Sequence, residues 1–302
     1  MNNRRLLVVS PVRNEAAFLQ RTIDSVVAQT VRPVVWLIVD DGSTDDTPRI
    51  AEEAARHHDW IQVYRRRDRG SRKLGGGVVE AFDDGLSRFD LAEFDYLCKL
   101  DGDLEFGPTY FEELFRKFEA DAALGSASGK SWIRVGERLV PERTSDQFSQ
   151  GQSKLYRVKC FREIGGFVRE VMWDGIDCYT CHMHGWKARS FRDEGLRFIH
   201  LRPMGSSVKN IYTGRLRWGR GQYFMGTHPL YAMGIAAYRM LERPWVVGGL
   251  LILAGYVSGY LRGLPRYENE GFRQYLRRWQ LARLRLASPP AVAEPGLAAM
   301  GN

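Results

Sequence analysis

The sequence Asp95-Tyr-Leu-Cys-Lys-Leu-Asp101-Gly-Asp103-Leu-Glu105 is a short apolar run that ends on two carboxylates separated by one glycine. The run is typical of a buried strand, and the carboxyl ends of strands are where open α/β sheets bind ligands. Two aspartates on a tight turn can hold Mg²⁺, which often combines one or two carboxylates with substrate phosphates. The stretch predicts a site for a metal-bound diphosphate, and the alternative is an ordinary acidic turn.

Strands and helices alternate around this stretch. Apolar runs predict strands at residues 6–9, 34–39 and 61–64 and one or two strands at 123–135. Helical spacing predicts helices at 15–29, 78–88, 108–120, 154–164 and 173–185. A further helix, capped by Ser43 or Thr44, is expected to reach His57. This order predicts a mostly parallel, Rossmann-like sheet flanked by helices. The length of 302 residues fits one large domain with an appendage.

A basic, glycine-rich loop spans residues 65–77. Glycines let a backbone approach a ligand closely, and the start of the following helix favours an anion. Arg72 and Lys73 lie nearest the glycines and are the expected phosphate contacts. The alternative is a solvated surface loop.

The character of the chain changes after residue 208. Residues 244–261 are uncharged and bounded by Arg243 and Arg262, and residues 272–286 predict a basic amphipathic helix. A buried helix, an interfacial helix and a membrane span are the three alternatives, and we favour a membrane-dipping or interfacial hairpin. The expected organisation is a catalytic domain at 1–208, a helical membrane-associated region at 209–287 and a disordered tail at 288–302.

The charge balance restricts the partners. A net charge of +8 favours anionic partners, and basic residues gather at 262–285. No aromatic-and-basic pattern of a nucleic-acid recognition module is present in the sequence, so we expect no nucleic-acid partner. The four cysteines do not form a disulfide framework, and the amino terminus lacks the longer apolar core of a secretory signal. The expected location is cytoplasmic, at the inner face of the cell membrane.

Four motifs follow one another at predicted strand or helix ends. They are Ser10-Pro-Val-Arg-Asn-Glu15, Asp40-Asp-Gly-Ser-Thr-Asp45, Asp101-Gly-Asp103 and Gly175-Ile-Asp177 before Gly185-Trp-Lys187. In this order they resemble the inverting family 2 glycosyltransferases of the GT-A fold. The resemblance covers about the first two hundred residues and implies a UDP- or GDP-sugar donor.

The resemblance also implies roles for individual residues. The donor site would comprise Pro11, Asn14, Glu15, Asp40, Asp41 and Asp101, with Arg72 and Lys73 from the basic loop. Mg²⁺ or Mn²⁺ would be held by Asp103 with Asp101 and His200. Asp177 would be the base that deprotonates the acceptor hydroxyl, with Asp174 as the alternative because Ile176 stands where the family has glutamate.

Arg217-Trp218 resembles the end of the Gln-x-x-Arg-Trp motif of processive family 2 synthases, but Gly214 replaces the glutamine. We therefore expect transfer of one sugar, with Trp218 as an acceptor platform. The predicted function is a membrane-associated transferase that acts on a lipid-linked saccharide in polysaccharide or glycolipid synthesis. The alternatives are a polyprenyl-phosphate sugar synthase and a noncatalytic binding protein that retains the fold.

Overall fold

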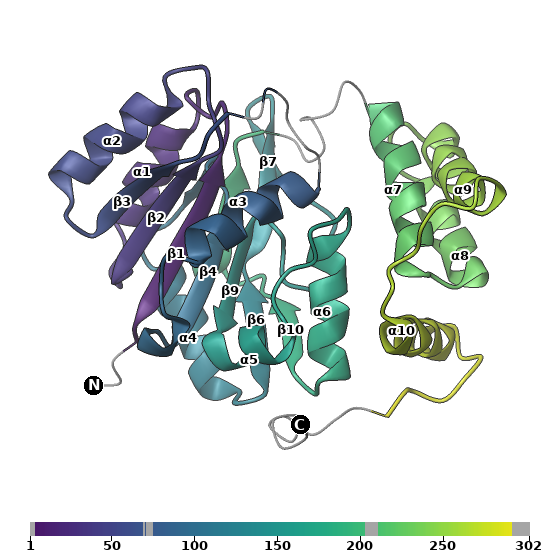
Figure 1. The fold of residues 1–302 in the computed structure, drawn as a ribbon. Helices are drawn as coiled ribbons and strands as arrows, with labels where there is room; N and C mark the ends of the chain where they lie inside the picture. Colours follow the sequence, from purple (N-terminus) through teal and green to yellow (C-terminus); the bar gives the residue numbers. More distant parts are fainter. Residues whose placement is uncertain (1–3, 69, 71–74, 203–210, 292–302) are drawn as a thin grey trace. The chain divides into compact units, whose positions relative to one another are not determined.

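The computed structural model describes residues 4–68, 70, 75–202 and 211–291 (Figure 1). The chain divides after Arg202 into two compact units. The described residues up to Arg202 form an α/β unit, and residues 211–291 form a helical unit. Arg72 and Lys73 lie outside the described residues, as does most of the predicted tail.

The first unit contains a seven-stranded sheet with the order β10-β6-β9-β4-β1-β2-β3. Its strands are β1 (Leu6–Val12), β2 (Val35–Asp40), β3 (Ile61–Arg65), β4 (Tyr96–Leu100), β6 (Leu124–Ser128), β9 (Ser153–Arg157) and β10 (Lys187–Ser190). Strand β9 runs antiparallel to β4 and β6, and the other pairings are parallel. The expected mostly parallel α/β architecture is confirmed.

A smaller sheet has the order β5-β11-β7-β8. Its strands are β5 (Leu104–Phe106), β7 (Lys130–Val135), β8 (Arg138–Pro141) and β11 (Arg197–His200). Strand β5 starts directly after Asp103, and β11 pairs with it in antiparallel register, so that His200 lies opposite Leu104. This pairing brings the end of β11 to the acidic turn.

Helices cover both faces of the large sheet (Figure 1). One face packs on α1 (Leu19–Val27), α2 (Thr47–His57) and α4 (Tyr110–Ala120), and the other on α3 (Gly76–Leu86), α5 (Val158–Glu163) and α6 (Trp173–Met183). Two short 3-10 turns, η1 (Leu91–Glu93) and η2 (Glu194–Leu196), complete the unit. Successive residues of β1 alternate between the two cores, because side chains of a strand point to opposite faces.

Two local predictions were wrong. The helix expected at 154–164 is divided into strand β9 and the short helix α5. Leu155 and Tyr156 point into opposite cores, which is the alternation of a strand rather than of a helix. Helix α2 begins at Thr47, after Asp46, and not at Ser43 or Thr44, because those two residues bond with Asn14 of the neighbouring loop.

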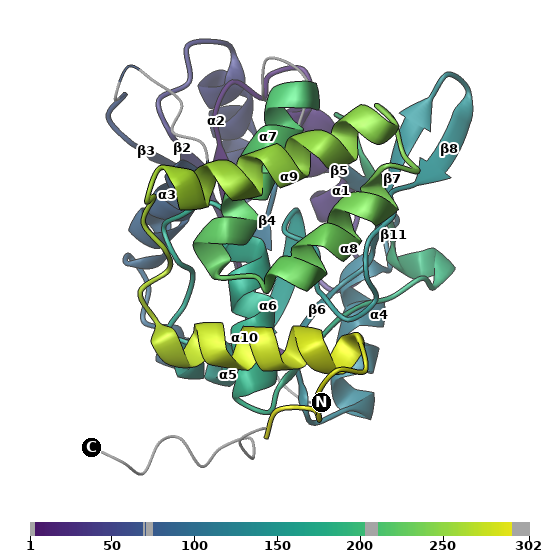
Figure 2. The same ribbon diagram turned by 90° about the vertical axis from the view of Figure 1, so that its right-hand side faces the viewer.

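The second unit consists of α7 (Ile211–Met225), α8 (Pro229–Arg239), α9 (Val246–Leu261) and α10 (Glu270–Arg283) (Figure 2). Helices α7 and α9 meet backbone to backbone through glycines. A Cβ on Gly255 would lie 2.1 Å from the carbonyl oxygen of Leu216, and one on Gly219 would lie 2.0 Å from that of Ile252. Among the described residues, no helix has the length and apolar character needed to cross a membrane.

We expect Gly255→Val to destabilise the helical unit by more than about 2 kcal/mol, because the new side chain must separate two backbones in contact. Ala254→Val is the matched control, since Ala254 is exposed on the same helix and should change stability by less than about 0.5 kcal/mol. Thermal unfolding followed by circular dichroism measures both. Equal stability of the two variants would contradict the close packing of α7 and α9.

Acid should destabilise the first unit through His182 of α6. Burial lowers the pKa of this imidazole from 6.5 to about 4, and its ring packs on Phe148. The unfolded chain therefore takes up a proton below pH 6.5 that the folded chain binds only near pH 4. This contribution of His182 to the free energy of unfolding is fully present above pH 6.5. It is lost as the pH falls from 6.5 to 4, by about 3 kcal/mol.

A His182→Gln variant should lose most of this dependence on pH, and His57→Gln, at an exposed position on α2, should keep it. Urea unfolding at a series of pH values makes the comparison. If the free energy of unfolding depends on pH in the same way for the native chain and for His182→Gln, His182 does not cause the loss of stability in acid.

Candidate active site

The candidate site lies at the carboxyl-terminal edge of β1, β2 and β4. These three strands are parallel neighbours, so the loops that follow Val12, Asp40 and Leu100 emerge on the same edge. The first three sequence motifs occupy these loops. The fold therefore brings together residues that are far apart in the sequence.

The loops after β1 and β2 are bonded to each other through Asn14. Its backbone N–H donates to Ser43 Oγ at 3.0 Å, and its side-chain oxygen accepts from the backbone N–H of Thr44 at 2.8 Å. Asn14 has a φ of 55°, in the left-handed region where asparagine is tolerated. Next to it, the Glu15 N–H donates to Thr47 Oγ1 at 2.7 Å. Asn14 thus shapes the predicted donor pocket by joining its two loops.

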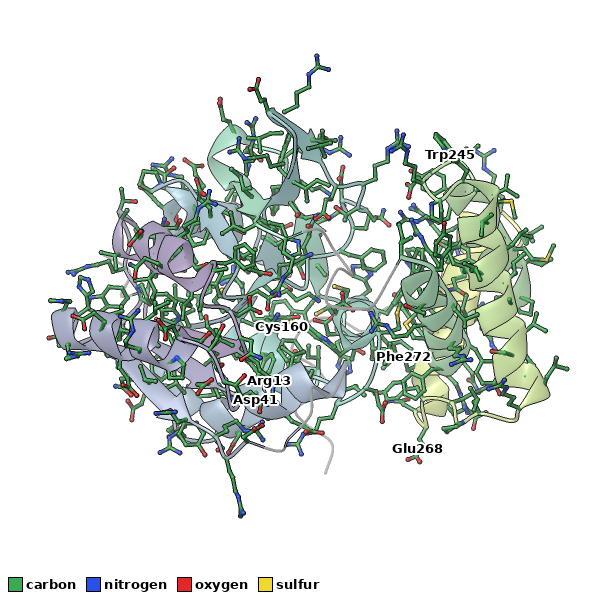
Figure 3. The ribbon with its side chains drawn as sticks, turned by 90° about the horizontal axis from the view of Figure 1, so that it is seen from above. Arg13, Asp41, Cys160, Trp245, Glu268 and Phe272 are labelled. Atoms are coloured by element: carbon green, nitrogen blue, oxygen red, sulfur yellow. The ribbon has the colours of Figure 1, made fainter. Side chains whose placement is uncertain are left out.

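Asp40 and Asp41 have different partners. Asp40 is buried and accepts a hydrogen bond from the Ser43 N–H at 2.9 Å, which closes the turn after β2. Asp41 forms an ion pair with Arg66, which also contacts Asp84 at 2.7 Å. Arg13 donates to the Asp41 carbonyl and, at 2.9 Å, to Asp68 (Figure 3). Pro11 is buried within β1 beneath these loops.

Arg13 and Arg66 were not predicted as site residues. Arg13 belongs to the first motif and Arg66 to the basic loop, so both lie in segments that the sequence singled out. Burial opposes the charge of Arg66, but Asp84 and Asp41 outweigh it and raise its pKa. Two fixed cations therefore lie beside Asp41.

Asp101 is paired with a buried lysine. Lys99, at 3% exposure, donates to Asp101 Oδ1 and, at 2.8 Å, to the carbonyl oxygen of Gly151. Burial raises the pKa of Asp101 although Lys99 opposes the shift, and the carboxylate of Asp103 acts in the same direction as burial. The lysine therefore ties the acidic turn to the segment that precedes β9.

Asp103 lies at the centre of a second ionic cluster. Arg202 reaches Asp103 Oδ2 at 2.8 and 3.0 Å and both oxygens of Glu15 at 2.6 and 2.7 Å. His200 Nε2 lies 3.4 Å from the same Asp103 oxygen. This cluster joins the loop after β1, the acidic turn and the end of β11. Arg202, which nothing in the sequence motifs indicated, links Asp103 to Glu15 within it.

The pKa shifts in this cluster have clear causes. Burial alone would raise the pKa of Asp103, but hydrogen bonds and charge from His200 and Arg202 lower it. Burial alone would lower the pKa of His200, but Asp103 and Glu142 raise it to about 9. Asp103 is thus an anion at neutral pH, and His200 must give up its proton before its ring nitrogen can bind a cation.

The predicted metal ligands Asp101, Asp103 and His200 gather at this turn. Carboxylate oxygens and an imidazole nitrogen are ligand types that Mn²⁺ accepts, and carboxylates suit Mg²⁺. The donor set therefore fits a divalent cation. Within the described ranges, no three His, Cys, Asp or Glu side chains are arranged to hold a metal by themselves.

Asp177, which the resemblance implies as the base, lies in a buried ion pair. The ammonium of Lys154 donates to both of its carboxylate oxygens, and the hydroxyl of Tyr156 donates to Oδ2. Asp177 is 2% exposed and Lys154 is completely buried. Burial opposes the charge of Lys154, but Asp177 outweighs it and raises the Lys154 pKa. Both Asp177 oxygens are thus engaged inside the protein.

Asp174, three residues earlier, is exposed in the first turn of α6. A Cβ on Gly151 would lie 3.1 Å from Asp174 Oδ2, and the Gly151 carbonyl accepts from Lys99, the partner of Asp101. Lys154 donates to the backbone carbonyl of Asp174 at 2.7 Å. The structure therefore brings Asp174, and not Asp177, to the acidic turn as an accessible carboxylate.

Trp173 supports this arrangement. Its indole ring lies 5.1 Å from the ammonium of Lys99 and 5.5 Å from that of Lys154. A cation over an indole ring is attracted by the ring's electrons. Trp173 therefore links the lysine of the acidic turn with the lysine that holds the start of α6.

Trp218 belongs to the helical unit, where the guanidinium carbons of Arg239 and Arg215 lie 4.8 and 5.8 Å from its ring. Its acceptor role stays a prediction.

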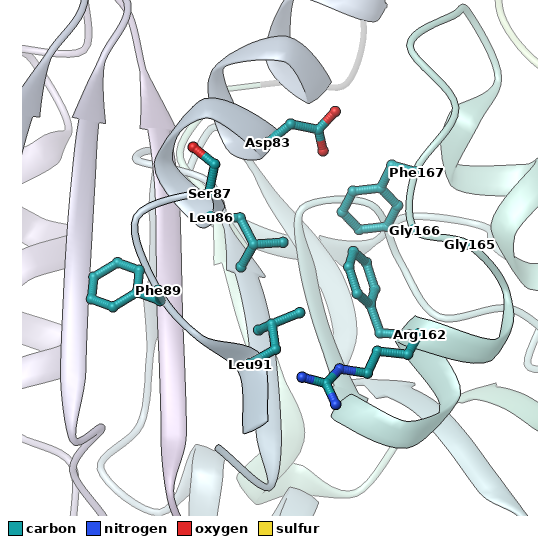
Figure 4. A pocket seen from close by; sticks show the side chains of 10 residues that line it. Asp83, Leu86, Ser87, Phe89, Leu91, Arg162, Gly165, Gly166 and Phe167 are labelled. Carbon is teal, nitrogen blue, oxygen red and sulfur yellow. The ribbon is translucent and has the colours of Figure 1, made fainter. Parts of the chain in front are cut away.

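A separate cavity of about 410 Å³ lies near the end of α3, beside η1 and α5 (Figure 4). Leu86, Phe89, Phe161 and Phe167 are among its lining residues. The chain segments that form it precede β4 or follow β9, at the opposite edge of the sheet from the acidic turn. None of the predicted site residues lines this cavity.

Known structures share this fold. The mannosyltransferase PcManGT from Pyrobaculum calidifontis, solved with GDP-Man and Mn²⁺, aligns with a TM-score of 0.53 at 17% identity over 93% of this chain and 86% of its own. Residues 1–349 of TarS from S. aureus, in complex with UDP-GlcNAc, align with a TM-score of 0.53 at 15% identity over 94% and 82%. The α/β unit is thus of the GT-A type.

The family model for glycosyl transferase family 2 matches residues 7–174. The chain belongs to glycosyltransferase family 2, which confirms the resemblance drawn from its motifs. Glycosyltransferase AglD of Haloferax volcanii is 33% identical over 63% of the chain and 27% of that protein. The polyprenol monophosphomannose synthase of Mycolicibacterium smegmatis is 31% identical over 49% and 55%. The chain thus spans about a quarter to a half of the length of these two relatives.

Proposed function

We propose that this glycosyltransferase moves one sugar from a nucleoside diphosphate sugar to an acceptor hydroxyl, with inversion at the anomeric carbon. The observation that carries the proposal is that one loop, at Gly151, joins Asp101 of the acidic turn to the exposed Asp174. Asp101 belongs to the predicted donor site, and the carboxylate of Asp174 can take the proton from the hydroxyl of the acceptor sugar or lipid. Direct displacement needs a stabilised leaving group and one base, and no covalent intermediate.

The donor diphosphate would be held at the acidic turn with a divalent cation. Asp103, Asp101 and His200 would hold the cation, which supplies charge stabilisation to the departing diphosphate. Arg202 and Lys99 position the two carboxylates, and the loops joined by Asn14 would enclose the nucleoside beside Asp41. The Mn²⁺ in the structure of PcManGT supports this assignment.

We propose Asp174 rather than Asp177 as the base. A base must lie within hydrogen-bond reach of the proton that it removes, and the exposed side chain of Asp174 allows this. Asp177 instead neutralises Lys154 inside the protein. Lys154 in turn fixes the first turn of α6 by bonding the Asp174 carbonyl, so that Asp177 acts as a structural support for the site.

The names of relatives support a saccharide or lipid-linked acceptor. They include the polyprenol monophosphomannose synthase and a poly-β-1,6-N-acetyl-D-glucosamine synthase of Staphylococcus epidermidis, which is 29% identical over 69% of this chain. We propose a role in the synthesis of a surface polysaccharide or glycolipid at the cytoplasmic face of the cell membrane. GDP-Man and UDP-GlcNAc in similar structures make GDP- and UDP-sugars the donors to test first.

The experiment is a screen of nucleotide sugars for release of nucleoside diphosphate in the presence of Mn²⁺ or Mg²⁺. We expect one donor to be consumed, and we expect EDTA to reduce the rate at least about a hundredfold until the metal is restored. Asp103→Asn should have a similar effect at saturating metal, and Asp90→Asn, at an exposed carboxylate outside the site, serves as a control. Full activity in EDTA would contradict the metal assignment.

The polyprenol monophosphomannose synthase favours a second candidate, in which the acceptor is a lipid phosphate. A phosphate acceptor is already ionised at neutral pH and needs no base. Full transfer to a polyprenyl phosphate by Asp174→Asn would support that function. Calorimetry without metal-dependent binding of GDP or UDP would instead favour a noncatalytic protein that retains the fold.

A further inference from the structure

Two helices of the second unit carry an apolar outer face. On α8 and just beyond it, Leu230, Met233, Ala237 and Leu241 are exposed at intervals of three or four residues, as are Val247, Leu250, Ala254, Val257 and Leu261 on α9. We call these nine residues the outer face. Leu241 and Leu261 are 70% and 82% exposed. The intervals put each set on one side of its helix, and α8 packs beside α9 (Figure 2).

The inner side of α9 is already used for packing. Gly255 contacts α7, and Gly249 lies against the carbonyl oxygen of Ala236 on α8. Helix α9 is therefore apolar on its inner and its outer side. A helix of this kind is normally covered on all sides, and contiguous exposed apolar patches mark interaction surfaces. Of the eighteen large apolar side chains that are exposed in the described residues, fifteen belong to this unit.

The charge of the helical unit indicates which kind of partner binds the outer face. Residues 211–291 contain twelve arginines, three glutamates and neither lysine nor aspartate, a net charge of +9 against +8 for the whole chain. Arg243 and Arg262, both exposed, stand at the two ends of α9, and α10 adds the exposed Arg278. Exposed Trp245, seen in Figure 3, and exposed Tyr238 lie near the Arg243 end. An apolar strip with cationic ends and amphipathic aromatic side chains is complementary to an anionic lipid surface.

A second copy of the chain fits this surface poorly. Two such faces in contact would bring two units with a charge of +9 together, and like charges at an interface are unfavourable. The length of α9 also argues for a helix that lies in the membrane surface. Its 16 residues span about 24 Å, less than the hydrocarbon thickness of about 30 Å, and both of its ends are cationic.

We propose that the outer face of α8 and α9 inserts into the interface of an anionic lipid membrane, with both helices lying in the plane of the surface. The apolar side chains enter the boundary of the acyl chains, and Arg243 and Arg262 contact the headgroups. The acceptor of the transferase reaction, if it is lipid-linked, is then presented at the same surface. This binding does not depend on the proposed reaction.

Flotation of the full chain with vesicles tests the proposal. The probes are vesicles of phosphatidylcholine alone and of phosphatidylcholine with phosphatidylglycerol. The native chain should float with the anionic vesicles. Leu250→Gln/Val257→Gln should bind them at least about tenfold more weakly while its helical circular dichroism remains unchanged. Val135→Gln/Val140→Gln is the matched control, because these valines are exposed on the β7–β8 hairpin of the first unit.

A second variant tests the charges separately. Arg243→Gln/Arg262→Gln should lose much of the preference for anionic over neutral vesicles and much of the dependence on salt. Equal flotation of the Leu250/Val257 variant and the native chain would overturn the proposal. So would a native dimer in light scattering that Leu250→Gln/Val257→Gln converts to a monomer, since the face would then bind a second copy.

Discussion

An Asp174→Asn variant should transfer sugar to a hydroxyl acceptor about 10²–10⁴-fold more slowly than the native chain, which is the usual loss when a general base is removed. The fold should be unaffected, because Asp174 is exposed and Lys154 bonds its backbone carbonyl, which asparagine retains. The donor KM should change little, since the acidic turn is untouched. Steady-state rates of nucleoside diphosphate release at saturating acceptor, together with a thermal melt, measure the effect.

The matched control is Glu170→Gln, which removes an exposed carboxylate shortly before α6 and should keep the native rate. A native rate in Asp174→Asn with a hydroxyl acceptor would contradict the assignment of the base. A loss of rate that accompanies a lowered melting temperature would not identify the base, so the comparison is made with variants of equal stability. The comparison therefore measures the contribution of Asp174 to the reaction rate separately from any effect on stability.

An Asp177→Ala variant should lose about 3–5 kcal/mol of unfolding free energy, because it leaves the ammonium of Lys154 buried without its carboxylate. Lys154 is completely buried and Asp177 is 2% exposed, so water cannot replace the missing partner. The double variant Lys154→Met/Asp177→Leu should recover most of the loss, since it removes both charges and keeps apolar volume. Urea unfolding of the first unit, followed by tryptophan fluorescence, measures these changes.

Asp46→Ala provides the control for an ion pair at the surface. Asp46 and Arg49 contact each other at 3.0 Å with both side chains about two-thirds exposed, and such pairs contribute about 1 kcal/mol or less. Native stability combined with complete loss of transfer in Asp177→Ala would reverse the roles that we assign to Asp177 and Asp174. The two aspartates are therefore distinguished by one pair of measurements, stability and rate.

Much of the first unit could be predicted from local sequence. The apolar runs before Asp40 and Asp101 are long enough to indicate strands, and parallel strands place their carboxyl ends on one edge. The motifs at those ends were therefore predicted to share a site, and the structure brings them together. The segment 154–164 is predicted as one helix, whereas its first residues lie in β9, where buried Lys154 pairs with Asp177 from a distant helix.

The partners of the acidic residues could not be predicted. Arg202 reaches Asp103 and Glu15, from which it is separated by 99 and 187 residues in the sequence. The glycines of α9 are another example, because only the structure shows that Gly255 and Gly249 serve close contacts with α7 and α8. The sequence showed that this segment is apolar but not which of its sides is covered.

The sequence by itself determined most of the strands and helices before residue 120, the family, and the strand ends at which the acidic motifs stand, because these depend on local periodicity and spacing. Only the tertiary structure decided which aspartate of α6 is accessible. Asp174 and Asp177 are three residues apart on one helix and have the same chemistry, so sequence cannot rank them. The packing of α6 against β9 buries Asp177 on Lys154 and leaves Asp174 exposed, because a buried ammonium requires a carboxylate beside it.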